Sequence, residues 1–274
     1  MSLVDVLFIG GGPAGLSAAL TPVRQHHTVV VFDINDSRAL PSAKLYGISG
    51  AEGKSPMELI NHLRGELTAY DDYTAVNIEV THVKKVDSGF KATDKNEKAY
   101  HGKKLILASG AYTKDPSNRH CGVLAMDWIA MPQFTYHMSH LGYQLASGNE
   151  DLEETLKATV KEKPWNTENR KIIAIQRAPE RPEDNAVEVL FEDGTSKREA
   201  FIGHAPITLL RGPWAQQLGI EVTQSGGEYV TNGPFQETSV KGVYAVGDTM
   251  TPFKAWSNAV FSGAQAAAGI AVAL

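Results

Sequence analysis

The chain has 274 residues, of which 42% are hydrophobic and 21% charged, and its formal net charge is −5 at pH 7. This is an ordinary globular composition, and a negative charge without a basic cluster argues against nucleic acid as a partner. The one cysteine, Cys121, excludes an internal disulfide framework, a C-x-x-C redox pair and a cysteine-based zinc site, and we expect no metal site. The apolar runs are far shorter than a membrane span and no secretory leader is visible, so we expect a cytoplasmic protein.

The stretch from residue 4 to residue 33 predicts a strand, a glycine-rich turn, a helix and a second strand. Residues 4–9 form a short apolar run, and residues 28–32 are rich in β-branched side chains. Apolar residues after the turn recur at helical spacing, which predicts a helix that lies on a sheet. The turn itself has the spacing G-x-G-x-x-G, made by Gly10, Gly12 and Gly15.

These glycines predict a dinucleotide-binding turn. Gly10 allows the tight turn out of the strand, Gly12 lets a pyrophosphate approach the backbone, and Gly15 lets the helix approach the sheet. The helix N-terminus offers free N–H groups and partial positive charge to phosphates. Asp33, at the end of the second strand, is placed to accept hydrogen bonds from a ribose hydroxyl. The alternative is an ordinary strand–helix–strand unit that binds no ligand.

Further short elements are predicted up to Gly110. Ser55 as N-cap and Pro56 at the first helical position mark the start of a helix. The predicted elements are a helix over 56–64, a strand over 76–86, a hairpin around residues 94–96 and a buried strand over 104–109.

The composition changes after Gly110, where residues 112–120 predict a connector. The elements predicted beyond it are a strand over 122–126, a helix over 127–141 interrupted by Pro132, an amphipathic helix over 152–161, and strands over 172–176, 187–191 and 197–204. Asp193-Gly194 is typical of a hairpin turn. A buried strand over 243–246 then ends at Gly247-Asp248, and a helix of small residues starts at Ala255.

Three motifs together carry a resemblance to a known family. They are the glycine-rich turn, the sequence ASG at 108–110 and the sequence GVYAVGD at 242–248. Together they resemble the FAD-dependent pyridine nucleotide-disulfide oxidoreductases and, within these, the thioredoxin reductase-like group. Residues 242–260 are similar to the C-terminal motif of the fungal gliotoxin-type dithiol oxidases, which serve natural-product pathways.

The resemblance implies an α/β fold with two domains. It implies a Rossmann-type FAD-binding domain of three layers (ββα), formed by residues 1–114 and 242–274. A reduced second α/β domain, degenerate relative to the NAD(P)-binding domain of the family, would be inserted over residues 115–241. Members of the family are usually homodimers, so a homodimer is implied here as well.

The resemblance also implies which residues bind FAD. Those implied at the ADP half are Gly10, Gly12, Pro13, Ala14 and Gly15, with Asp33 at the ribose, Arg38 near the phosphates or adenine, and His82 or Val83 on the strand whose backbone meets the adenine. Those implied near the flavin are Gly110, Asp248 at the ribityl chain, and Ser257, Asn258 and Ala259 at the start of the last helix, under the pyrimidine edge.

Two parts of the family pattern are missing from this sequence. The path from Gly110 to Gly122 is too short for the C-x-x-C loop of the family, and Cys121 has no partner cysteine. No glycine occurs from residue 123 to residue 141, so bulky side chains would block a second dinucleotide. We therefore expect neither a dithiol relay nor NAD(P)H binding. The dithiol oxidases also act without nicotinamide, so the missing cysteines are the departure from these relatives.

Several side chains are candidates for chemistry beside a flavin. His120, His137 and His140 are candidate proton-transfer residues, because histidine titrates near neutral pH; a surface or packed histidine is the alternative for each. Trp256, next to the last helix, is the aromatic residue most readily placed in the site. Lys254 is predicted to face the flavin or its phosphates, or else solvent.

The sequence thus predicts an FAD-dependent oxidase. Its substrate would be a small aromatic or polyketide-like natural product that gives a hydride to the flavin, with dioxygen as the final acceptor. Two alternatives remain open: an isomerase or cyclase that keeps FAD as a scaffold or acid–base group, and a non-catalytic FAD-binding protein.

Overall fold

The computed structural model describes residues 3–113, 170, 172–177, 187–199 and 208–274. The chain divides into two compact units, one made of Met1–Arg119 with Pro206–Leu274 and the other of His120–Ala205.

The first unit therefore takes segments from both ends of the sequence. After the second unit, the chain re-enters this unit at Pro206, before the boundary that the sequence analysis expected at residue 242. Trp214, Ile220 and Tyr229, which the sequence analysis assigned to the inserted domain, are buried in its core.

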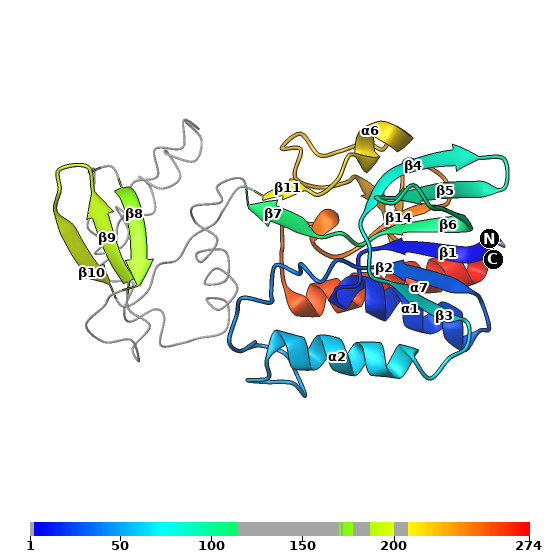
Figure 1. Ribbon diagram of the computed structural model, residues 1–274, viewed down its shortest axis with the longest axis horizontal. Helices are drawn as coiled ribbons and strands as arrows, with labels where there is room; N and C mark the ends of the chain where they lie inside the picture. The colour runs from blue at the N-terminus through cyan, green and yellow to red at the C-terminus, as the bar shows by residue number, and fades with distance from the viewer. Residues whose placement is uncertain (1–2, 114–169, 171, 178–186, 200–207) are drawn as a thin grey trace. The chain divides into compact units, whose positions relative to one another are not determined.

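A parallel sheet forms the centre of the first unit (Figure 1). Its strands are β1 (Val4–Ile9), β2 (Val29–Phe32), β3 (Tyr73–Val76), β6 (Ala99–Leu107) and β14 (Val243–Ala245). They lie in the order β14-β6-β1-β2-β3, and each neighbouring pair is parallel. The carboxyl ends of β1, β6 and β14 are therefore neighbours, and these ends carry the three glycine-containing motifs.

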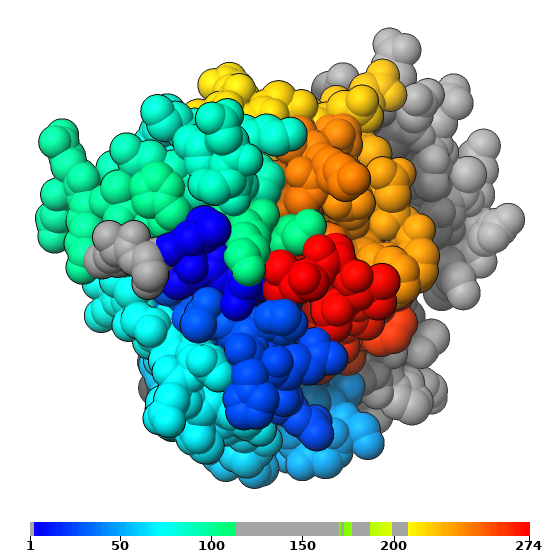
Figure 2. Space-filling model, turned by 90° about the vertical axis from the view of Figure 1, so that its right-hand side faces the viewer, coloured from blue at the N-terminus to red at the C-terminus, as the bar shows by residue number. Residues whose placement is uncertain are grey.

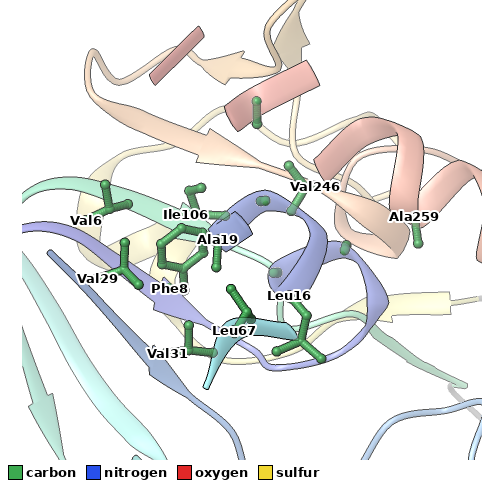
Figure 3. Packing of buried hydrophobic residues seen from close by; sticks show 14 of the residues in the cluster. Val6, Phe8, Leu16, Ala19, Val29, Val31, Leu67, Ile106, Val246 and Ala259 are labelled. Carbon is green, nitrogen blue, oxygen red and sulfur yellow. The ribbon is translucent and has the colours of Figure 1, made fainter. Parts of the chain in front are cut away.

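Three helices cover one face of this sheet: α1 (Pro13–Arg24), α2 (Pro56–Leu67) and α7 (Trp256–Ala273) (Figure 1). Figure 3 shows Phe8 and Val31 of the sheet close to Ala19 of α1 and to Leu67 of α2. The Ser55 side chain accepts a hydrogen bond from the Glu58 N–H at 3.2 Å, which confirms the predicted N-cap of α2. The helix layer thus follows from apolar spacing and a local cap.

Small residues bring α1 and α7 into close contact. A Cβ atom on Gly263 would lie 2.4 Å from the Ala14 carbonyl oxygen, so only glycine allows the two helices to approach this closely. Figure 2 shows the C-terminal end of α7 (red) beside α1 (blue) on the surface of the unit. The helix that the sequence predicted from its run of small residues therefore packs against the first helix of the chain.

An antiparallel layer covers the opposite face of the sheet and consists of β4 (Val80–Val86), β5 (Gly89–Asp94) and the first part of β6. β6 belongs to both layers, because Gly102 pairs with Phe90 of β5 on one side and with Val4 of β1 on the other. A Cβ atom on Gly102 would lie 2.6 Å from Leu7 Cγ, so glycine is required where the strand crosses. Helices, parallel sheet and antiparallel layer form the predicted three layers.

The predicted strand over 76–86 is two elements. β3 ends at Val76 and β4 begins at Val80, and between them the Ile78 N–H donates to the Val76 carbonyl oxygen at 3.0 Å. Apolar side chains continue to alternate through this turn, so periodicity alone does not reveal it. The turn takes the chain from the parallel sheet to the antiparallel layer.

The remaining elements of the first unit are short. They are β7 (Ala111–Thr113), β11 (Thr208–Leu210), α6 (Trp214–Leu218), β12 (Thr231–Asn232), β13 (Glu237–Thr238) and a 3₁₀ turn over Gly247–Thr249. β7 and β11 pair antiparallel, and β12 and β13 extend the large sheet beside β14. None of the helices in the described ranges is both long and apolar enough to cross a membrane.

In the second unit the structure describes a three-stranded antiparallel sheet, made of β8 (Ile172–Arg177), β9 (Val187–Phe191) and β10 (Ser196–Glu199) in the order β10-β9-β8. The Thr195 N–H donates to Asp193 Oδ1 at 2.9 Å and Gly194 has a φ of +81°, which confirms the predicted hairpin turn. The predicted elements over 122–126, 127–141 and 152–161 lie outside the described residues.

A polar cluster holds together the amino ends of β1 and β2. Asp5 Oδ2 accepts hydrogen bonds from the Thr28 N–H at 2.9 Å and the Thr28 hydroxyl at 3.0 Å, and Asp5 Oδ1 accepts one from Lys103 Nζ at 2.7 Å. Burial alone would raise the pKa of Asp5, but the hydrogen bonds from Lys103 and Thr28 outweigh it and lower the pKa below its ordinary value of 3.8. The carboxylate therefore stabilises the folded state in its charged form.

We expect Asp5→Asn to lower the free energy of unfolding at neutral pH by about 1–2 kcal/mol, because charge-assisted hydrogen bonds are lost. The pKa of Asp5 is lower in the folded state, so its contribution is complete above the unfolded-state pKa and disappears as the pH falls through the folded-state value. Denaturant unfolding of both proteins over an acid pH series measures the difference, which should shrink as the pH falls. A difference independent of pH would contradict this assignment.

Candidate functional site

The turn between β1 and α1 depends on glycine at two positions. Gly10 has a φ of +114°, and a Cβ atom there would lie 2.2 Å from the Ala108 carbonyl oxygen. A Cβ atom on Gly15 would lie 2.0 Å from the Gly10 carbonyl oxygen. A side chain at Gly10 would collide with the backbone at the end of β6, and one at Gly15 would push α1 away from the sheet, as the sequence analysis anticipated for Gly15.

Gly12 has a different role, because no described residue lies close to the position that its side chain would take. A Cβ atom on Gly12 would meet no described residue within 4 Å, and Gly12 is the N-cap of α1 with Pro13 following at the first helical position. Gly12 has no side chain that could cap this helix, and no acidic residue lies in its first turn. The free N–H groups and the positive end of the helix dipole are thus available to a diphosphate.

The carboxyl end of β6 reaches the same turn and contains a polar atom without a partner. The Ser109 hydroxyl is buried and has no hydrogen-bond partner among the described residues. A buried unpaired hydroxyl is costly, so a ligand that supplied a hydrogen bond there would be stabilised. Gly110 follows with a φ of +72°, as the turn after the strand requires. This edge of the sheet therefore fits a polar cofactor.

Asp33 lies at the end of β2, directly beside the glycine turn. A Cβ atom on Gly11 would lie 2.7 Å from Asp33 Cβ, so this glycine makes room for the acid. Asp33 Oδ1 accepts a hydrogen bond from the Asn35 N–H at 3.1 Å, and Arg64 of α2 donates to Asp33 Oδ2 and to Asn35 Oδ1. A carboxylate has about four acceptor positions, so capacity for a ribose hydroxyl remains.

Arg38 and Asp248, both predicted to bind the cofactor, contact each other across the carboxyl edge of the sheet. Arg38 Nε and Nη2 donate to Asp248 Oδ2 at 3.2 and 2.9 Å, and the side chains are only 16% and 17% exposed. The pair joins the loop after β2 to the loop after β14. It places a shielded carboxylate and a guanidinium where the two chain ends meet.

The start of α7 completes this edge. The Gly247 N–H donates to Ser262 Oγ at 2.9 Å, and a Cβ atom on Gly247 would lie 2.8 Å from Ala14 Cβ. Ser257 is exposed, Asn258 Nδ2 donates to the Phe253 carbonyl oxygen at 3.0 Å, and Ala259 is buried. The N-cap residue of α7, Ala255, makes no side-chain cap, and the first turn of α7 contains no acidic residue. Its first N–H groups are therefore available to an electron-rich ligand edge.

The predicted adenine strand carries a contact that the sequence did not reveal. His82 is exposed, whereas Val83 is buried and its N–H donates to Gln217 Oε1 of α6 at 2.8 Å. Gln217 Nε2 also donates to the Thr81 carbonyl oxygen at 3.3 Å. A hydrogen bond from the Val83 N–H to adenine would require Gln217 to move, and the adenine role of these residues stays a prediction.

The predicted catalytic residues have different outcomes. Trp256 is 8% exposed and lies in the apolar cluster under the helices, so any role in catalysis stays a prediction. His120, His137 and His140 lie outside the described residues, as does Cys121. Lys254 does not face solvent, because its side chain is only 9% exposed and its Nζ donates to Glu228 Oε1 at 2.8 Å.

The sequence analysis missed Gly11, Arg64 and Glu228 as parts of this edge. Of these three residues, only Gly11 could have been identified from the sequence, because it lies within the glycine turn. Arg64 and Glu228 lie in segments whose local pattern indicates only a helix and a turn. Their partners are distant in the sequence, so no spacing rule connects them.

Comparison with known proteins agrees with this geometry. Residues 4–140 match the family described as pyridine nucleotide-disulphide oxidoreductase. The chain is 34% identical to thioredoxin reductase aclD of Aspergillus oryzae, over 98% of this chain and 95% of that protein. It is 30% identical to thioredoxin reductase sirT of Leptosphaeria maculans, over 98% and 94% of the two chains.

Solved structures have the same fold. An oxidoreductase from Agrobacterium tumefaciens superimposes with a TM-score of 0.81 at 24% identity, over 99% of this chain and 98% of that chain. The crystal structure of HlmI superimposes with a TM-score of 0.76 at 21% identity, over 98% and 92% of the two chains. At these identities the likeness concerns the fold alone.

Proposed function

The chain belongs to the pyridine nucleotide-disulphide oxidoreductase family and is an FAD-dependent oxidoreductase, and we propose that it oxidises a small organic molecule without NAD(P)H and without a disulfide. The observation that carries this proposal is the cysteine count. Cys121 is the only cysteine among the 274 residues, and an intrachain dithiol–disulfide couple needs two. Electrons must therefore enter and leave by another route than an intrachain disulfide.

When bound, FAD supplies a two-electron carrier, so that the substrate loses two electrons and two protons and dioxygen gains both as hydrogen peroxide. The residues of the chain would bind FAD and orient it. The N-terminus of α1 beside Gly12 holds the diphosphate, and the carboxylates of Asp33 and Asp248 accept hydrogen bonds from hydroxyl groups. The first turn of α7 favours negative charge beside it.

Independence from NAD(P)H is supported by the sequence of the second unit. Residues 123–141 contain no glycine, and close approach of a pyrophosphate to a strand–helix turn requires glycine. The segment begins with a predicted strand and helix, where the family has its second dinucleotide site. A nicotinamide cofactor would therefore lack its phosphate cradle.

The substrate class rests on the resemblance of residues 242–260 to the gliotoxin-type dithiol oxidases. We propose a small natural-product intermediate, aromatic or polyketide-like, with dioxygen as electron acceptor. The aclD and sirT relatives are both fungal proteins named thioredoxin reductases, and those names describe them rather than this chain. A homodimer and a cytoplasmic location belong to the proposal on the same grounds of resemblance and composition.

A second candidate function is an isomerase or cyclase that uses FAD without net redox change. The joint loss of the cysteine pair and of the second glycine motif favours it, because both routes by which the family moves electrons are missing. A non-catalytic FAD-binding protein would show the same losses.

An extract from a strain that lacks this protein provides the test. The purified protein is incubated with the extract in air and under anaerobic conditions, with flavin-stripped protein as the control. We expect one metabolite to be consumed in air, with uptake of dioxygen and release of hydrogen peroxide. Product formed without air and without bleaching of the flavin would support the isomerase instead. No consumption under either condition would contradict both enzymatic functions.

A further inference from the structure

Lys254 has every donor of its ammonium group occupied by the protein. Lys254 Nζ donates to Glu228 Oε1 at 2.8 Å, to the Asp248 carbonyl oxygen at 2.8 Å and to the Thr251 carbonyl oxygen at 2.6 Å. An ammonium group has three donors, so these bonds use them all. The side chains of Lys254 and Glu228 are each 9% exposed. This lysine is therefore an internal part of the loop after β14.

Glu228 also accepts hydrogen bonds from two hydroxyl groups in its own turn. Thr223 Oγ1 donates to Glu228 Oε2 at 3.0 Å, and Ser225 Oγ donates to it at 3.3 Å. Burial would raise the pKa of Glu228, but the hydrogen bond and charge of Lys254, with the two hydroxyl groups, keep it below its usual value. The next residue, Tyr229, donates its N–H to the Thr249 carbonyl oxygen at 2.7 Å. The turn over 223–228 is thus fastened to the loop over 248–254.

A buried ion pair needs a reason beyond stability. Two apolar side chains of similar volume often stabilise a protein as well or better, because charges are costly to remove from water. The charged pair also fixes the position of the loop, because its hydrogen bonds hold two backbone carbonyl groups in place. One of them belongs to Asp248, whose carboxylate accepts hydrogen bonds from Arg38 Nε and Nη2.

The loop that Lys254 fixes lies between two parts of the candidate site. It begins at Asp248, and α7 begins at Trp256, two residues after Lys254. A displacement of this loop would shift both the Asp248 carboxylate and the first N–H groups of α7. Lys254 itself has no donor left to offer a ligand, so its effect on the site must be indirect.

We propose that Lys254, paired with Glu228, is a positioning residue that holds Asp248 and the start of α7 in the arrangement that binds FAD. The proposal rests on the assigned cofactor and adds a residue to its site that does not touch it.

The test compares Lys254→Met with Lys103→Met. Both variants remove one partner of a lysine–carboxylate pair, but Lys103 contacts Asp5 at the amino ends of the strands, at 2.7 Å. FAD is removed from each folded protein and its rebinding is followed by flavin fluorescence, with circular dichroism to verify the fold. We expect Lys254→Met to weaken FAD binding about tenfold, the effect of losing a charge-assisted hydrogen bond. Lys103→Met should bind FAD as wild type does.

Lys254→Met leaves the carboxylate of Glu228 without its charged partner and therefore lowers stability. A second variant separates this loss of stability from a loss of FAD binding. Lys254→Met with Glu228→Met removes both charges and should recover stability while FAD binding stays weak. Recovery of FAD affinity together with stability would overturn the proposal, as would an unchanged affinity in Lys254→Met. Failure of the wild-type protein to bind FAD would instead refute the proposed function.

Discussion

Replacing Gly15 by alanine is expected to weaken FAD binding strongly and to lower the free energy of unfolding by about 3 kcal/mol. The new Cβ atom would lie 2.0 Å from the Gly10 carbonyl oxygen and 3.1 Å from Ala108 Cβ. Neither neighbour is the end of a flexible side chain, so α1 must withdraw from the sheet. The N–H groups that would bind the diphosphate move with the helix, and FAD affinity should fall at least about hundredfold, or 2.7 kcal/mol.

Gly65→Ala is the matched control for this prediction. Gly65 lies in α2, and a Cβ atom there would meet nothing within 4 Å. The alanine should stabilise the protein by about 0.5–1 kcal/mol, because glycine is unfavourable inside a helix. Denaturant unfolding and the ratio of flavin to polypeptide measure both variants. A Gly15→Ala protein that retains one FAD per chain would show that the turn does not hold the cofactor.

Asp248→Ala is expected to weaken FAD binding about hundredfold, because a carboxylate that would accept a hydrogen bond from the cofactor is lost and its partner Arg38 is released within the site. The change deletes a hydrogen-bond acceptor in the candidate site. It also leaves the Arg38 guanidinium, which is only 16% exposed, without its carboxylate. Flavin fluorescence titration of the stripped protein measures the affinity. Asp248→Asn, which keeps the shape and one acceptor, should lose less.

Asp36→Ala is the control for the loss of an acid near the same edge. Asp36 Oδ2 accepts a hydrogen bond from Arg211 at 2.9 Å, but the Asp36 side chain is 70% exposed. An exposed ion pair contributes at most about 1 kcal/mol, so FAD affinity should stay within twofold of wild type. Equal losses in Asp36→Ala and Asp248→Ala would mean that general charge, rather than the Arg38–Asp248 contact, governs binding.

The parts of the fold that were predicted correctly depend on neighbours in the sequence. The apolar run over 4–9 became β1, Ser55 capped α2, and Asp193-Gly194 closed a hairpin. Each of these features is decided within a few residues, by apolar periodicity, a cap or turn chemistry. The glycine turn was predictable for the same reason, because Gly10, Gly12 and Gly15 act on atoms that a short loop brings together.

The parts that were missed depend on residues far apart in the sequence. Arg38 meets Asp248 across 210 positions, and Arg64 meets Asp33 across 31. Charged side chains on loops have no period that would indicate their partners, and only the assembled sheet brings them to one edge. The early return of the chain to the first unit was missed likewise, since Tyr229 looks like any apolar residue after a glycine turn.

Anaerobic addition of NADPH or NADH to the purified yellow protein tests the central claim most directly. The claim is that the chain binds FAD at the edge formed by its two ends and does not reduce it with nicotinamide. We predict that the visible absorption band of the oxidised flavin persists after addition of either nucleotide in stoichiometric amount, while dithionite bleaches it. Rapid bleaching by NADPH or NADH would contradict the account.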